Sequence, residues 1–107
     1  MSDIYLDNAA TTKTYPEVVS KVIEMLTETY GNPSSLHRLG RESRLELEMA
    51  RRIIAESLGA SPEEIYFTSG GTESDNLAIK GACLANANRG NRIVTTAVEH
   101  PAVTKTI

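Results

Sequence analysis

The stretch Phe67-Thr68-Ser69-Gly70-Gly71-Thr72-Glu73-Ser74-Asp75-Asn76 decides the fold that we expect for this chain of 107 residues. An apolar segment over residues 64–68 is typical of a buried strand, and the paired glycines lead into a helical pattern over residues 73–87. A second strand is expected at residues 92–96, and Pro101 begins another helix. This order is typical of a right-handed parallel crossover with helices on both faces of the sheet. The sequence therefore predicts an α/β fold with the first strands of a mainly parallel sheet.

Upstream of this crossover, the pattern predicts a short strand at residues 4–6 and two amphipathic helices. The first helix is expected over residues 16–30, with Thr14 as its N-cap. The second helix is expected over residues 40–58, where Gly59 ends it. A capping box with proline at its first helical position then predicts a single helical turn at residues 61–64.

The composition excludes several classes of protein. Hydrophobic residues make up 40% and charged residues 23%, as in ordinary soluble domains. The net charge of −3 disfavours direct nucleic-acid binding, and no apolar run reaches the ~20 residues of a membrane span. Residues 1–4 lack the pattern of a secretory signal. The single cysteine, Cys83, is expected to be a buried structural thiol. Because it has no second cysteine to form an internal disulfide with, a reduced, cytoplasmic setting is favoured.

The paired glycines form the first candidate site. Backbone N–H groups at a helix N-terminus attract anions, and Gly70 and Gly71 allow a ligand to approach the backbone closely. Thr72 adds a hydroxyl, so this turn is a candidate phosphate cradle. The alternative is a plain strand-to-helix turn in which Thr72 caps onto Asp75. Neither a Walker loop nor a dinucleotide-binding glycine pattern is present.

His100 is the second candidate, because it follows the strand expected at residues 93–98. Ligands of open α/β sheets bind at the carboxyl ends of the strands, so parallel strands would bring Thr72 and His100 to one edge. His100 would then stack on a ligand or exchange protons with it. The alternative is a surface histidine that caps the last helix. No residues have the paired spacing of a metal site, so no metal is expected.

Four motifs of this chain resemble those of the cysteine desulfurases, which are pyridoxal 5'-phosphate (PLP) enzymes of the class V aminotransferase group and fold type I. They occur in family order and cover nearly the whole chain: YLDNAATT at 5–12, YGNPSSLH at 30–37, IYFTSGGTESDN at 65–76 and EH at 99–100. The resemblance implies that residues 1–60 supply helices of the small domain and the dimer contact. Residues 61–107 would then begin the large PLP-binding domain.

The resemblance also implies roles for single residues. Gly71 and Thr72 match the positions that bind the PLP phosphate. His100 matches the catalytic histidine that stacks on the pyridine ring and shuttles protons. A loop near the substrate is matched by Asn8, Ala10 and Thr11.

The family's reaction converts L-cysteine to L-alanine and passes the sulfur to an enzyme cysteine as a persulfide. An acceptor or scaffold protein of iron–sulfur cluster or thiolation pathways then takes the sulfur, and the parent enzyme is a cytoplasmic homodimer. In the family, the Schiff-base lysine and the nucleophilic cysteine lie downstream. Because none of the residues present matches them, we expect this chain to be inactive alone; those compared are Lys13, Lys21, Lys80, Lys105 and Cys83.

Three alternatives remain at this stage. One is another class V enzyme, a selenocysteine lyase or a transaminase. Another is a non-catalytic module that holds PLP or another phosphate, and the last is a dimerisation fragment without a ligand. Replacing Thr72 by alanine would weaken PLP binding in every case except the last.

Overall fold

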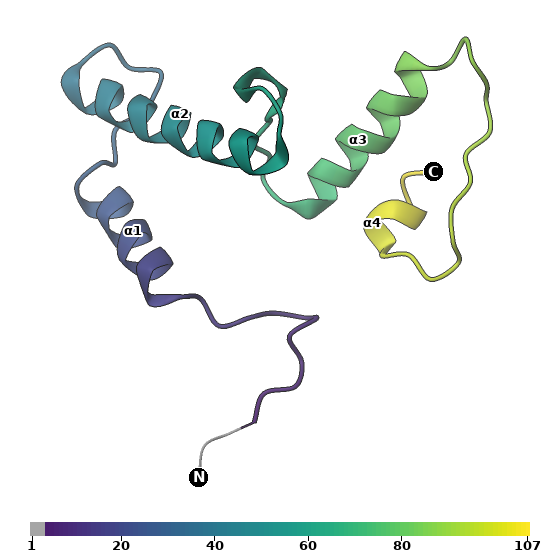
Figure 1. Ribbon diagram of the computed structural model, residues 1–107, viewed down its shortest axis with the longest axis horizontal. Coiled ribbons are helices and arrows are strands. Elements are labelled where there is room, and N and C mark those ends of the chain that lie inside the picture. The colour runs from purple at the N-terminus through teal and green to yellow at the C-terminus, as the bar shows by residue number, and fades with distance from the viewer. Residues whose placement is uncertain (1–3) are drawn as a thin grey trace. The chain divides into compact units, whose positions relative to one another are not determined.

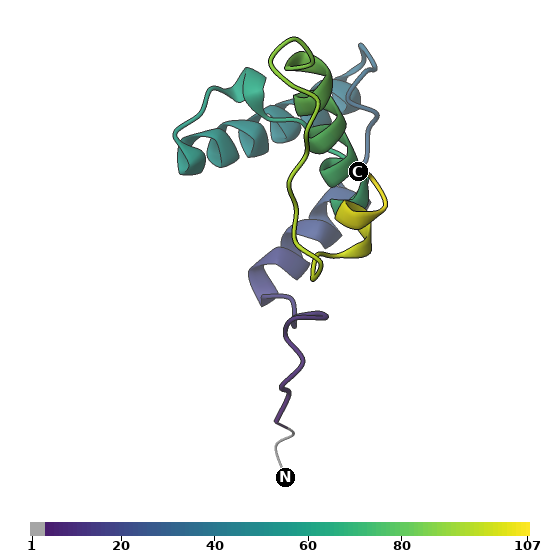
Figure 2. The ribbon, with the colours of Figure 1, turned by 90° about the vertical axis from the view of Figure 1, so that its right-hand side faces the viewer.

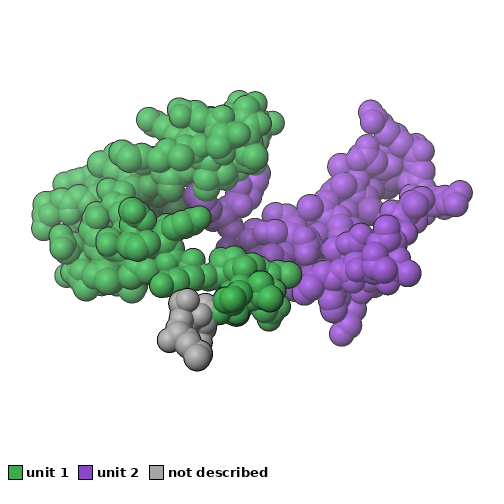
Figure 3. All heavy atoms as spheres, turned by 60° about the horizontal axis from the view of Figure 1, so that its bottom comes forward, with its two compact units in different colours: residues 1–65 green, residues 66–107 purple. Residues whose placement is uncertain are grey.

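A computed structural model describes residues 4–107, which form helices joined by loops (Figures 1 and 2). Residues 1–3, part of the segment in which we expected no secretory signal, lie outside the described residues. The chain divides into two compact units, unit 1 over Met1–Ile65 and unit 2 over Tyr66–Ile107 (Figure 3). The helices, in chain order, are α1 (Pro16–Thr27), α2 (Arg38–Leu58), the 3₁₀ turn η1 (Pro62–Glu64), α3 (Gly71–Ala85) and α4 (Pro101–Thr104).

Helix α1 begins at Pro16 as predicted but ends earlier than expected. Its N-cap residue is Tyr15, which makes no side-chain capping bond, so the prediction that Thr14 caps the helix was wrong. The amides of residues 28 and 29 both donate to the Glu24 carbonyl, at 2.8 and 3.2 Å. This shared acceptor interrupts the regular i to i−4 ladder, and the helix stops at Thr27 instead of residue 30.

Helix α2 confirms its predicted end and begins two residues before its predicted start. The His37 side chain caps it by accepting a hydrogen bond from the Gly40 amide at 3.3 Å. Gly59 ends the helix with a left-handed backbone (φ 65°), a conformation that favours glycine. The capping box is also confirmed, since the Glu64 carboxylate accepts from the Ser61 amide at 2.8 Å.

The turn between α1 and α2 is held by side chains of α2. Ser43 is buried and donates its hydroxyl to the Thr29 carbonyl at 2.8 Å, while the Arg44 Nε donates to the Pro33 carbonyl at 2.8 Å. A Cβ atom on Gly31 would lie 2.4 Å from a backbone oxygen of α2. Gly31 is therefore required by this close approach, and not as the cap of α1.

None of the expected strands is formed within residues 4–107. The segments at 4–6, 64–68 and 92–98 run without a β-ladder, and the long connection from α3 to α4 is visible in Figure 1. A strand needs a neighbouring backbone to accept and donate its hydrogen bonds, and the described residues offer these segments none. Their side chains are uncovered as well, with Val94 81% and Val98 90% exposed. The predicted sheet is thus not formed within residues 4–107.

The apolar faces of the helices are present but largely uncovered. Ala55 and Ala102 are the buried apolar residues of the described part. On the predicted face of α1, Val18 and Val22 are each 50% exposed, and Leu26 is 71% exposed. No helix within residues 4–107 is long and apolar enough to cross a membrane.

Candidate functional site

The N-terminus of α3 leaves several hydrogen-bond donors without partners. Helix α3 begins at Gly71, two residues before its predicted start, so Gly71 and Thr72 belong to its first turn. The first intrahelical bond runs from the Ser74 amide to the Gly70 carbonyl at 3.1 Å. The three preceding amides, of Gly71, Thr72 and Glu73, have no partner within residues 4–107, and neither does the Thr72 hydroxyl. This turn can bind an anion.

The loop before α3 is fastened by side chains. The Glu73 carboxylate accepts from both the amide and the hydroxyl of Ser69, at 2.7 Å each. These bonds, the hydroxyl first, lower the pKa of Glu73 below its ordinary value. The hydroxyls of Thr68 and Ser74 meet at 2.6 Å. The alternative cap from Thr72 to Asp75 is not formed.

His100 caps helix α4 through its ring. Its Nδ1 accepts a hydrogen bond from the Ala102 amide at 3.1 Å. In the neutral ring the proton is therefore assigned to Nε2, which remains available as a donor. The capping histidine that we considered as an alternative is thus observed, and it leaves the other ring nitrogen free for a ligand.

The structure brings Thr72 and His100 to one cavity of about 250 Å³ within unit 2. Helices α3 and α4, which supply most of its walls, contact each other (Figures 1 and 2). No carboxylate lines the cavity, and Lys105 has no ion-pair partner in the described part of the chain. The cavity is therefore suited to a negatively charged group; its walls are Thr72, Asn76, His100, Pro101, Ala102, Lys105 and Thr106.

The predicted substrate-proximal residues lie in unit 1, in an exposed turn before α1. The amides of Ala10 and Thr11 donate to the Asp7 carbonyl at 3.1 and 3.4 Å, and Asn8 lies within the same turn. The turn is a local structure, and the role of these residues toward a substrate stays a prediction.

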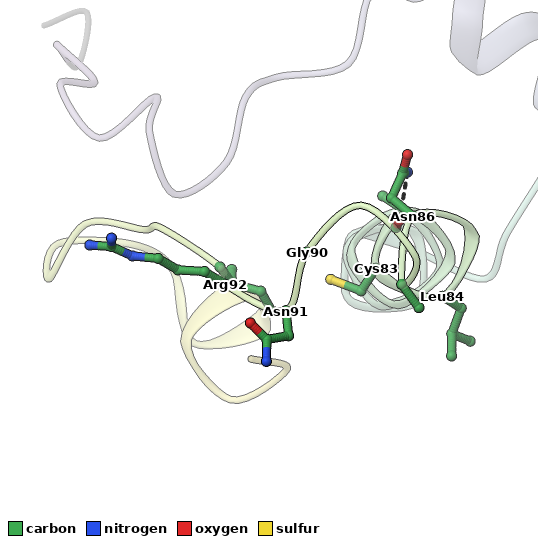
Figure 4. Close-up of a pocket in the computed structure, with 9 residues that line it drawn as sticks. Cys83, Leu84, Asn86, Gly90, Asn91 and Arg92 are labelled. Atoms are coloured by element: carbon green, nitrogen blue, oxygen red, sulfur yellow. Dashed lines mark hydrogen bonds between the residues drawn. The ribbon is translucent and has the colours of Figure 1, made fainter.

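A larger hollow of about 490 Å³ in unit 2 lies between the end of α3 and the turn that follows it (Figure 4). The sulfur of Cys83 points toward Gly90 and Asn91, whereas the Arg92 side chain extends away. Cys83 is exposed, so the prediction of a buried thiol was wrong for this structure. The reason is that the turn after α3 leaves a hollow beside Cys83 and does not pack against it. Within residues 4–107 no group of histidine, cysteine and carboxylate side chains is placed to hold a metal.

Comparison with known proteins assigns the family. The family profile described as aminotransferase class V matches residues 4–107. The chain belongs to the class V aminotransferases. The cysteine desulfurase IscS of Methanosarcina thermophila is 50% identical over 103 residues, which cover 96% of this chain and 26% of that protein. The putative cysteine desulfurase IscS 1 of Bacillus subtilis is 50% identical over 106 residues, which cover 99% of this chain and 28% of that protein.

A solved structure supports the same assignment. A NifS-like protein matches with a TM-score of 0.83 and 43% identity, over 92% of this chain and 27% of that chain. The predicted resemblance to the cysteine desulfurases is therefore confirmed, and the fold is that of the class V family. This class V chain spans about a quarter of the length of the curated relatives that it matches, within their N-terminal part.

The family implies PLP, and the residues of this class V chain fit the phosphate group of that cofactor. At the cavity the donor set combines the unpartnered amide and the hydroxyl of Thr72 with the Lys105 ammonium, all of which favour an anion. Gly71 and Glu73 supply the other unpartnered amides of this turn but do not line the cavity. The cavity is smaller than the roughly 300–1,000 Å³ of most ligand pockets. The described residues of unit 2 therefore enclose only part of such a cofactor.

Two residues of the cavity were missed from the sequence. Asn76 lies one helical turn after Thr72, and that spacing is a signal that would have found it. Both polar atoms of its side-chain amide are hydrogen-bonded: Nδ2 donates to the Thr72 carbonyl at 2.9 Å, and Oδ1 accepts from Lys80 at 2.7 Å. Lys105 carries no local signal, because only the packing of α4 brings it to the cavity.

Proposed function

We propose that this chain is the N-terminal portion of a PLP-dependent cysteine desulfurase that converts L-cysteine to L-alanine. The sulfur would pass to an enzyme cysteine as a persulfide, and then to an acceptor or scaffold protein of iron–sulfur cluster or thiolation pathways. The parent enzyme would be a cytoplasmic homodimer. Bound PLP supplies an electron sink for the bond changes at the substrate carbon. The names of the relatives and the donor set of unit 2 support this proposal.

In this proposal Gly71 and Thr72 bind the cofactor phosphate, and His100 lies against the ring and holds a proton at Nε2. The observation that carries it is the meeting of Thr72 and His100 at one cavity without a carboxylate. Unit 1 would contribute Asn8, Ala10 and Thr11 near the substrate. The chain alone would not turn over cysteine, because none of its lysines or its single cysteine matches the family's reactive residues.

The proposal also assigns the two parts of the chain. Residues 1–60 would supply small-domain and dimer-contact helices, and residues 61–107 would open the large PLP-binding domain. The segments 64–68 and 92–98, which we expected to be strands, would form part of a mainly parallel sheet when the rest of that domain pairs with them.

Calorimetric titration with 4-deoxypyridoxine 5-phosphate tests the phosphate site. This probe lacks the aldehyde of PLP and therefore cannot react with surface lysines. We expect the wild-type chain to bind it more tightly than 4-deoxypyridoxine without the phosphate. Thr72→Ala should weaken binding about tenfold or more, because a hydrogen bond to a charged group is lost.

Thr72→Ser is the matched control, since it keeps the hydroxyl and should bind within about threefold of the wild type. Equal binding of the probe with and without its phosphate would overturn the phosphate site. Equal binding by the alanine and serine variants would show that the Thr72 hydroxyl takes no part.

A further inference from the structure

Ser69 donates two hydrogen bonds to the Glu73 carboxylate, and these close a ring across Gly70 and Gly71. The backbone of residues 69–72, which we propose to bind the phosphate, is called the phosphate turn below. Both oxygen contacts to the Ser69 amide and hydroxyl measure 2.7 Å, and both use the same carboxylate oxygen. Between the two residues lie Gly70 and Gly71, where a Cβ atom would meet nothing within 4 Å. Packing therefore does not hold this stretch of backbone. The bonds that Ser69 donates to Glu73 bridge it, and the Thr68 hydroxyl adds a bond to the Gly70 carbonyl at 3.2 Å.

The carboxylate of Glu73 is directed at the loop and not at the cavity. Glu73 supplies one of the three unpartnered amides of the first turn, yet it does not line the cavity with Thr72 and His100. Glycine loses more backbone freedom on ordering than any other residue, so a Gly-Gly turn presents its amides in one arrangement only when something fixes it. The Ser69 bonds fix it, with the Thr68–Ser74 hydroxyl pair as a second fastening at 2.6 Å.

Charge alone would disfavour an acid at this position. A carboxylate in the first turn repels a phosphate bound at the same helix N-terminus. At an effective dielectric constant near that of water the repulsion energy is small, but it still opposes binding. The charge of Glu73 therefore weakens phosphate binding, whereas its ordering of the backbone would strengthen it. The two effects can be told apart by their sign.

We propose that Glu73 is a positioning residue, which orders the Ser69–Thr72 backbone for phosphate binding by accepting hydrogen bonds from Ser69. This inference rests on the proposed function of the same turn. The lowered pKa of Glu73 agrees with it, since the carboxylate is then ionised at neutral pH and accepts both bonds.

Binding of 4-deoxypyridoxine 5-phosphate to variants of the 107-residue chain tests the inference. Glu73→Ala should weaken binding about tenfold, although it removes a negative charge beside an anion. Glu73→Gln keeps an acceptor for Ser69 and should restore binding to within about threefold of the wild type. Glu17→Ala is the matched control, because it removes an acid from the first turn of α1 that makes no side-chain bond in the described residues. Tighter or unchanged binding by Glu73→Ala would overturn the inference.

A ligand-free measurement separates this inference from the phosphate site itself. The amide exchange rate of Ser69, whose N–H donates to the Glu73 carboxylate at 2.7 Å, should rise about tenfold or more in Glu73→Ala when read by NMR, and should remain near the wild-type rate in Glu73→Gln. An unchanged rate in Glu73→Ala would overturn the positioning role. If the wild-type chain failed to distinguish the probe from its phosphate-free form, the proposed function would fail, and the exchange rate would still decide the role of Glu73.

Discussion

The lowered pKa of Glu73 predicts how the stability of the phosphate turn depends on pH. Its carboxylate prefers the ionised form in the folded chain, because the Ser69 hydroxyl and amide lower its pKa below the ordinary 4.5. The stabilising effect is therefore fully present above pH 4.5 and is lost as the pH falls through the lowered pKa. An NMR titration of the Glu73 side chain should give a midpoint below 4.5. In Ser69→Ala the midpoint should rise toward that value, and an unchanged midpoint would contradict the assignment of cause.

Single residues were predictable where the signal was local. Thr72 follows a pair of glycines and His100 precedes Pro101, each at the start of a helix, and the structure places both at one cavity. The bonds that Glu73 accepts from Ser69 were not predicted, because a glutamate in the first turn of a helix is common and does not indicate which group it binds. Cys83 was assigned wrongly because its exposure depends on what covers α3, which no local pattern shows.

At the scale of elements, the turn joining α1 to α2 predicts a steric test. A Cβ atom on Gly40 would lie 2.4 Å from the Ser35 carbonyl oxygen and 2.7 Å from that of Asn32. Both are backbone atoms and cannot rotate away, so Gly40→Ala should destabilise this turn by about 1–3 kcal/mol. Thermal loss of helical circular dichroism should begin at a lower temperature in this variant.

Gly81→Ala is the matched control for that test. Gly81 lies inside α3, and a Cβ atom there meets nothing within 4 Å. Alanine should therefore favour the helix by about 0.5–1 kcal/mol, since glycine is the poorer helix former. If Gly40→Ala and Gly81→Ala shifted the melting curve in the same direction, the close approach at Gly40 would not constrain the turn.

The helices were predictable as elements because the spacing of apolar residues, and for α1 and α4 the proline at the start, are properties of short windows. The ends of the helices were less predictable. Helix α1 stops where the Glu24 carbonyl accepts hydrogen bonds from two amides, and this depends on the turn that follows the helix. The strands at 64–68 and 92–98 were predicted from β-forming residues alone. A strand is completed by its neighbour, and residues 4–107 provide no neighbour for either segment.

At the scale of the whole chain, the exposed apolar side chains predict weak cooperativity. Large apolar residues of α1, α2 and α3 and of the segments around them are uncovered; Ile23, for example, is 56% exposed, Leu84 79% and Val98 90%. Burial of such a side chain contributes about 1.5–3 kcal/mol, against a cost of about 1–2 kcal/mol for ordering each residue of backbone. Without that burial, the contacts within residues 4–107 stabilise the folded chain only weakly.

We therefore expect the purified 107-residue chain to unfold over a broad temperature range and to associate through its uncovered faces and unpaired extended segments. Scanning calorimetry should show no sharp transition, and native mass spectrometry should show multiples of the 11.6 kDa chain. Adding PLP together with the separately expressed remainder of a cysteine desulfurase should replace those multiples by one defined complex, because the missing sheet neighbours then cover the same faces. A sharp, reversible transition in a pure monomer would contradict this account. It would mean that the contacts fastening the α1–α2 turn and the α3 N-terminus stabilise the chain without a large apolar core.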